Sequence, residues 1–168
     1  MKILFHFIIF IVFSHSSYAV DSSKSYVDNI LSNGIIVSPD SNTNDILKKL
    51  GKPTEIQIKT VDNLYSEIDD ELSSITYKGL SLLVYTTKSL ENNWSKVSKV
   101  SVKSNKYMLP YNIKIGANKS DLIKVLGKPH QVDGNYWYYF SSDNEPHLQL
   151  ILIVSNNELQ EFIWSYMP

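Results

Sequence analysis

The spacing of hydrophobic residues changes along this chain of 168 residues. In residues 23–32 they recur at intervals of three and four, which predicts a short amphipathic helix that ends at Asn33-Gly34. Near the C-terminus, aromatic and β-branched segments alternate with turn-forming sequences, a pattern typical of strands. We therefore expect an antiparallel meander of three strands, formed by residues 135–141, 147–154 and 158–166.

One phrase occurs twice, as NTNDILKKLGKP and as NKSDLIKVLGKP, with seven identities in twelve positions. Each copy predicts a short helix with both ends specified. An asparagine suits the N-cap, an aspartate three residues later reaches back to it, a glycine closes the last turn and a proline prevents its continuation. These residues are Asn42, Asp45, Gly51 and Pro53 in the first copy and Asn118, Asp121, Gly127 and Pro129 in the second.

The repetition predicts an α+β fold of two tandem repeats, each with short helices followed by a three- to four-stranded antiparallel sheet. After the first copy, strands are expected at residues 72–77, 80–87 and 94–103, with a further candidate at 55–60. The predicted division is a leader in residues 1–19, a first repeat with an acidic insertion in 20–106, and a second repeat in 107–168.

The first 19 residues have the pattern of a secretory signal peptide. Lys2 precedes an apolar run of eleven residues broken by His6, and Ser17-Tyr18-Ala19 fits the cleavage pattern of small residues around a central one. The run is too short for a permanent membrane span, which needs about 20 residues. We expect a periplasmic or secreted protein without a stable membrane anchor once the leader is cleaved; an uncleaved or interfacial N-terminus is the alternative.

Composition narrows the classes of partner. The chain has no cysteine, which excludes disulfides, thiolate chemistry and the lipid-carrying cysteine of a bacterial lipoprotein. All 16 basic residues are lysine and the formal charge is −1. Lysine lacks the planar fork that arginine offers to phosphates and base edges, so no nucleic-acid partner is expected.

The helix phrase, an aromatic W-x-Y strand and two further strands resemble the BamE (SmpA/OmlA) family of bacterial envelope proteins. The related beta-lactamase inhibitor protein fold, with two such units in tandem, is similar as well. The matching residues are clearest in the second copy: Gly116, Asp121, Val125, Leu126, Gly127, Pro129, Trp137 and Tyr139. The resemblance implies an adaptor or inhibitor that acts by contact, without a cofactor or catalytic centre.

The aromatic strand is the first candidate for such contact. Alternation sends Trp137 and Tyr139 to one side and Tyr136, Tyr138 and Phe140 to the other, so both sides of the sheet are apolar there. In the family pattern the W-x-Y pair faces the helices. The opposite side meets either the other repeat or a partner protein, where aromatic side chains with polar tips are common. The predicted contact residues are Tyr136, Tyr138, Trp164 and Tyr85.

The second candidate is the acidic stretch YSEIDDEL. Asp69 and Asp70 are its predicted contact residues, because an acidic loop that enters a basic cleft increases the rate and selectivity of association. The alternative is a solvated turn that keeps the protein soluble, as most charge runs do.

No motif predicts catalysis. Outside the leader the histidines are His130 and His147, and their spacing fits no metal signature. We therefore expect a protein without cofactor or metal that is not an enzyme and binds an envelope protein, a secreted enzyme or a toxin. Inhibitor, immunity protein and assembly adaptor all remain open, as does the oligomeric state. The alternative function is sequestration of a lipid or cell-wall fragment in a cleft between the repeats.

Overall fold

The computed structural model describes residues 22–63, 66–89, 93–141 and 148–166. Its helices are α1 (Ser22–Asn33), α2 (Thr43–Leu50) and α3 (Lys119–Leu126), with a 3-10 turn at Pro110–Asn112. Its strands are β1 (Glu55–Val61), β2 (Asp70–Tyr77), β3 (Leu80–Thr87), β4 (Trp94–Val102), β5 (Gln131–Asp133), β6 (Tyr136–Phe140), β7 (Leu148–Ser155) and β8 (Glu158–Tyr166). The predicted helices and strands are confirmed, and β5 is an addition.

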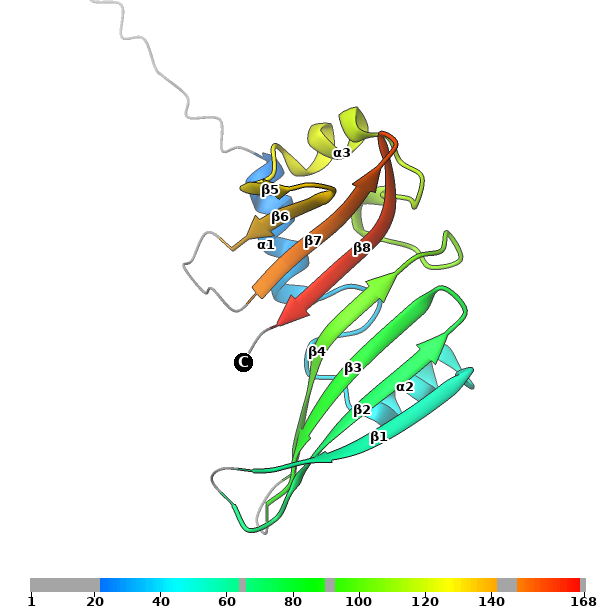
Figure 1. The fold of residues 1–168 in the computed structure, drawn as a ribbon, viewed down its shortest axis with the longest axis vertical. Coiled ribbons are helices and arrows are strands. Elements are labelled where there is room, and N and C mark those ends of the chain that lie inside the picture. The colour runs from blue at the N-terminus through cyan, green and yellow to red at the C-terminus, as the bar shows by residue number, and fades with distance from the viewer. Residues whose placement is uncertain (1–21, 64–65, 90–92, 142–147, 167–168) are drawn as a thin grey trace, which may run out of the picture.

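The eight strands of the described residues belong to one antiparallel sheet in the order β1-β2-β3-β4-β8-β7-β6-β5 (Figure 1). The predicted fold class, two repeats each with a sheet of its own, is therefore wrong. Residues 99–102 of β4 pair with residues 162–165 of β8 and join the two halves of the sheet. Left apart, β4 and β8 would each present unpaired N–H and C=O groups, and their pairing satisfies them.

The described helices cover one face of this sheet, and a single core lies between the two layers. One row on the helix side of the sheet crosses seven strands in register and contains Ile56, Ile75, Leu82, Val100, Trp164, Leu150 and Tyr139. Six of these side chains are at most 2% exposed, and Ile56, on the edge strand β1, is 39% exposed. The continuous row explains why the two halves share one core.

The repeated phrase forms α2 and α3 with the predicted N-caps. Asn42 and Asn118 each accept a hydrogen bond from the backbone N–H three residues later, at 3.0 Å. The loops that follow are tied to the sheet in the same way. Tyr77 of β2 donates its hydroxyl hydrogen to the Gly51 carbonyl at 3.0 Å, and Tyr139 of β6 donates to the Gly127 carbonyl at 3.1 Å.

The end of α2 provides a test of the helix stop. Gly51 has φ 79° and ψ −159°, a combination that is essentially restricted to glycine. A Cβ at this position would meet no atom within 4 Å, so the cost of a side chain is conformational rather than steric. We expect Gly51→Ala to lower the free energy of unfolding by about 1–3 kcal/mol in urea denaturation. Lys52→Ala is the control, and equal effects of the two substitutions would contradict the backbone argument.

Two findings bear on the predicted N-terminus. The leader, residues 1–19, lies outside the described residues, so its cleavage stays a prediction. Among the helices that the structure describes, none combines the length and the apolar character needed to cross a membrane.

Candidate functional site

The face of the sheet opposite the helices is here called the outer face. In one row across it, Tyr138 of β6 is opposite Ile151 of β7, which is opposite Ile163 of β8, and this residue is opposite Ser101 of β4. Ile163 is only 6% exposed, yet it does not belong to the core cluster on the helix side. Apolar side chains therefore pack on both sides of β8, but no described helix or strand covers the outer side.

The outer side of β6 carries a row of nearly parallel aromatic rings. The ring centroids of Tyr136 and Tyr138 are 6.5 Å apart, and those of Tyr138 and Phe140 are 6.3 Å apart. The His130 ring stacks on Phe140 at 5.9 Å, and its Nδ1 accepts a hydrogen bond from the Phe140 N–H. Tyr136 is 45% exposed. The row is thus held in place by β6 and its neighbours while a ring at its end stays open to solvent.

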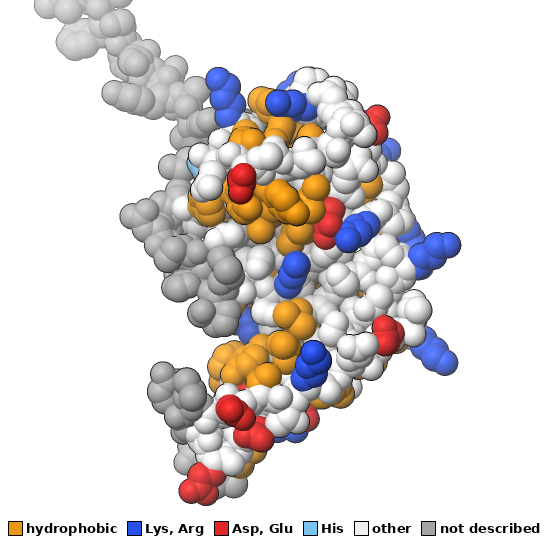
Figure 2. Space-filling view, viewed as in Figure 1, with side chains coloured by type: hydrophobic (Ala, Val, Ile, Leu, Met, Phe, Trp, Pro, Cys, Tyr) orange, Lys and Arg blue, Asp and Glu red, His pale blue; other side chains and the backbone are white. Residues whose placement is uncertain are grey.

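The isoleucines of β7 extend this row into a patch. Ile151 and Ile153 lie opposite Tyr138 and Tyr136 and are partly exposed. We call the five residues Tyr136, Tyr138, Phe140, Ile151 and Ile153 the aromatic patch. Figure 2 views the outer face and shows hydrophobic side chains gathered over this part of the sheet, with a second group lower down over β3 and β4.

A polar cluster lies beside the aromatic patch, because Glu161 of β8 is opposite Ile153 of β7. Glu161 of β8 accepts a hydrogen bond from the Ser101 hydroxyl and lies 3.2 Å from the Lys103 ammonium. Because Lys103 is largely exposed, this ion pair contributes little to stability. It places charged, hydrogen-bonding groups at one side of the aromatic patch, as in the polar rim of protein interfaces.

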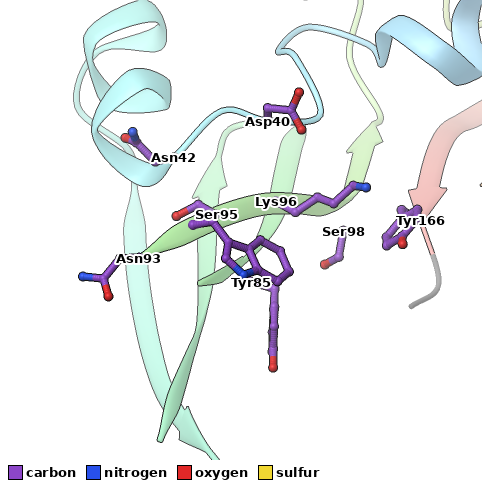
Figure 3. A pocket seen from close by; sticks show the side chains of 9 residues that line it. Asp40, Asn42, Tyr85, Asn93, Ser95, Lys96, Ser98 and Tyr166 are labelled. Carbon is purple, nitrogen blue, oxygen red and sulfur yellow. The ribbon is translucent and has the colours of Figure 1, made fainter. Parts of the chain in front are cut away.

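A pocket of about 740 Å³ lies where β4 diverges from the end of β8. We call it the edge pocket; it is lined by Asp40, Asn42, Tyr85, Asn93, Trp94, Ser95, Lys96, Ser98 and Tyr166. Trp94 is 52% exposed. The Lys96 side chain reaches from β4 toward Tyr166, and its ammonium lies 4.0 Å from the centre of that ring (Figure 3). Such a cation over an aromatic face is attractive.

Four of the six predicted contact residues are at least partly accessible. Tyr136 and Tyr138 belong to the aromatic patch, Tyr85 lines the edge pocket and Asp69 is exposed. The structure does not bring these four residues into one site. Tyr136 and Tyr138 lie in the half of the sheet formed by β5–β8, whereas Tyr85 and Asp69 belong to the half formed by β1–β4.

Trp164 is wrongly predicted as a contact residue. Its side chain is 0% exposed, and its indole N–H donates to the Leu31 carbonyl of α1 at 2.9 Å. The register places Trp164 opposite Leu150 of β7 and Val100 of β4, on the helix side of the sheet. A partner on the outer face cannot reach it.

Asp70 is wrong as a contact residue for a different reason. It is 2% exposed and accepts hydrogen bonds from the Tyr85 hydroxyl, the Lys88 N–H at 2.9 Å and the Asn63 amide at 2.9 Å. Burial alone would raise the pKa of this carboxyl group. The hydrogen bonds outweigh that effect and lower its pKa below the ordinary value, while the same carboxylate raises the pKa of Tyr85. Asp70 is a structural anion.

Metal ligation has no geometric support in the part of the chain that the structure describes, where no group of three His, Asp or Glu side chains is placed to hold an ion. His130 is exposed and stacked on Phe140. His147 lies outside the described residues, so a role for it is not tested.

Three accessible residues, Phe140, Trp94 and Tyr166, were not among the predicted contact residues. Phe140 has the same alternation phase as Tyr136 and Tyr138, so the sequence contained the signal that places it in the patch. Trp94 and Tyr166 border the edge pocket from the start of β4 and the end of β8. They are far apart in sequence, and without the pairing of β4 with β8 nothing indicates that they share a site.

Comparisons with protein-family models, curated proteins and solved structures gave no match for this chain. The resemblance to the BamE family and to the beta-lactamase inhibitor protein fold therefore stays a prediction from the sequence.

Proposed function

We propose that this chain is an exported, non-enzymatic protein-binding module that docks a partner protein on its aromatic patch. The observation that carries this proposal is the patch itself: a row of parallel rings flanked by isoleucines, on the face of the sheet that no described helix covers. Tyrosine and phenylalanine supply large contact areas with few side-chain torsions to immobilise, so they are frequent in the energetic centres of interfaces.

The setting of the patch supports a macromolecular partner more than a small ligand. The rings stand on β6, which pairs with β5 on one side and with β7 on the other, so the strand holds them in fixed positions. A rigid surface loses little entropy on binding. Glu161, which lies opposite Ile153, and its partners Ser101 and Lys103 give this side of the patch a polar rim that favours selectivity.

The leader pattern in the sequence supports a partner outside the cytoplasm, either an envelope protein or a secreted enzyme or toxin. Within this class an inhibitor, an immunity protein and an assembly adaptor would all use such a surface.

The test is affinity capture with protein purified after expression of the full chain. Tyr136→Ala/Tyr138→Ala is expected to lose a specific partner that wild type enriches, and to weaken binding of that purified partner by about 30-fold or more, since hot-spot truncations cost about 2 kcal/mol. The matched control is Tyr111→Ala, which removes an aromatic ring of similar exposure, 36%, away from the outer face. The proposal fails if the double variant and the control retain the partner equally while both remain folded.

The edge pocket supports a second candidate function, sequestration of a lipid or cell-wall fragment. Its volume of about 740 Å³ lies within the range of small-molecule sites, and Tyr85, Trp94 and Tyr166 give it an apolar wall. Native mass spectrometry of the purified protein distinguishes the two. A stoichiometric small molecule that Trp94→Ala releases supports sequestration, whereas an empty pocket together with loss of a protein partner from the patch variant supports docking.

A further inference from the structure

The strand β1 forms one edge of the sheet and has β2 as its neighbour in the described residues. Six of its seven side chains are exposed, including Ile56 at 39% and Ile58 at 60%. An exposed edge strand with β-branched residues presents free backbone N–H and C=O groups beside apolar side chains, which favours pairing with another strand. Such a strand therefore needs either a protecting feature or a partner.

The two sides of β1 differ in character. Ile56 and Ile58 lie opposite Ile75 and Ser73 of β2, both buried, so they point to the helix side of the sheet. Glu55, Gln57 and Lys59 point to the outer side, and the Gln57 amide donates to the Glu55 carboxylate at 2.7 Å. Along this side a negative charge, an amide and a positive charge follow one another at every second position.

We propose that β1 binds β1 of a second copy of this chain, antiparallel, in the register centred on Gln57. This register sets Glu55 of each copy opposite Lys59 of the other, and Ile56 of each opposite Ile58 of the other, with the two Gln57 residues face to face. Opposite charges and β-branched pairs directly across an antiparallel ladder are both stabilising. The contact is isologous, as expected for a two-fold dimer, and it would continue the sheet through both copies.

Neighbouring registers are less complementary. In a dimer whose two-fold axis is perpendicular to the sheet, the helices of both copies lie on the same side of the joined sheet. Each residue then pairs with one that points to the same side, so the axis lies between two copies of the same residue. Centred on Ile58, it sets Gln57 opposite Lys59 and leaves Glu55 opposite Val61. In the register centred on Ile56, Glu55 lies opposite Gln57, and no acidic residue lies opposite Lys59. The Gln57 register alone pairs both charges and all four isoleucines, which argues for a second copy rather than an unrelated strand.

This dimer is independent of the aromatic patch. β1 and β6 lie in opposite halves of the sheet, with β2, β3, β4, β8 and β7 between them. A second copy on β1 would leave both patches exposed and present two identical binding faces. Failure of the dimer therefore leaves the proposed docking function untouched, and the reverse also holds.

Charge reversal tests the register by sedimentation velocity over a concentration series. We expect wild type to show a monomer–dimer equilibrium, and Glu55→Lys and Lys59→Glu each to dimerise at least about tenfold more weakly, because each creates two like-charge pairs across the axis. An equimolar mixture of the two variants restores two attractive pairs and is expected to form a heterodimer. The proposal is overturned if wild type stays monomeric throughout, if the single variants dimerise like wild type, or if the mixture behaves as the sum of its parts.

The absence of native cysteine provides a second measurement. In the proposed register Gln57→Cys places two thiols directly opposite each other, within the Cα separation of 4.4–6.8 Å that a disulfide requires. Ile58→Cys is the matched control, since its two thiols are offset by two positions along the strands. We expect mild oxidation to link Gln57→Cys into a covalent dimer at least about tenfold faster than Ile58→Cys. Equal rates, or faster linkage of the control, would exclude this register.

Discussion

Replacing Trp164 with alanine is expected to lower the free energy of unfolding by about 3–5 kcal/mol, the largest effect that we expect of any single substitution here. The indole is fully buried and lies in the row that joins β4 to β8 and β7. Its N–H also donates to the Leu31 carbonyl, so it ties the sheet to α1 across 133 residues of sequence. Urea denaturation followed by circular dichroism measures the loss.

Trp164→Phe separates packing from hydrogen bonding. Phenylalanine retains most of the buried ring but leaves the Leu31 carbonyl without its donor, which costs about 1–3 kcal/mol. Ile163→Ala, one position away on the outer face, serves as the neighbouring control. If Trp164→Ala costs less than about 1 kcal/mol while partner binding falls, Trp164 is a surface residue and the orientation of β8 is wrong. The expected order is that Trp164→Ala destabilises the protein most and Trp164→Phe less.

The local elements of this fold follow from the sequence because short-range rules determine them. The capped helices α2 and α3 depend on an asparagine, a glycine and a proline at fixed offsets. The strands β6, β7 and β8 depend on alternation between turn segments, and their pairing as neighbours follows from the short connections. Each of these features needs information from no more than about 15 residues.

The joining of the sheet at β4 and β8 does not follow from such rules. Residues 99–102 and 162–165 are about 60 positions apart, and either strand could have ended the sheet of its own repeat. The pairing of β4 with β8 is stabilised because it buries one continuous row of side chains on the helix side, from Ile75 through Val100 and Trp164 to Tyr139. The sequence of either half alone contains only part of that row, so it does not indicate that the two halves pair.

The wrong prediction for Trp164 shows a second limit of prediction from the sequence. Alternation separates the residues of a strand into two sets but does not say which set faces the helices. In β8 a register shift opposite Ile153 and Val154 also places Leu159 and Phe162 in the same core, although strict alternation assigns them to opposite sides. A bulge of this kind changes the phase within a strand, and the sequence contains no clear sign of it.

Asp70 shows that the sequence also does not indicate which charged side chains are buried. In the sequence it is one carboxylate in an acidic run, and its exposed neighbour Asp69 has the solvated character expected of such a run. Its donors come from Tyr85 and Lys88 on the far side of a hairpin and from Asn63 before it. Only the pairing of β2 with β3 brings these groups together, so the sequence cannot distinguish a buried anion from a solvated one.

This buried anion leads to a pH-dependent prediction. The pKa of Asp70 is lowered in the folded state, so the unfolded chain takes up its proton at a higher pH than the folded chain does. The stabilisation is therefore complete above the unfolded pKa of about 4 and is lost as the pH falls through the lower folded value. We expect the free energy of unfolding of wild type to decrease below about pH 4, and Asp70→Asn to be about 2–4 kcal/mol less stable at pH 7, because hydrogen bonds to a charged acceptor are lost.

Asp69→Asn is the matched control for that prediction. It removes a carboxylate of the same type one position away, but from an exposed side chain, so we expect its effect on stability at pH 7 to stay within about 0.5 kcal/mol. Asp70→Asn should also flatten the acid side of the stability curve, whereas Asp69→Asn should leave its shape unchanged. Tyr85→Phe removes one donor and should raise the pKa of Asp70, which moves the acid loss to higher pH. Equal curves for the two asparagine variants would mean that Asp70 is solvated and that its hydrogen bonds do not stabilise the fold.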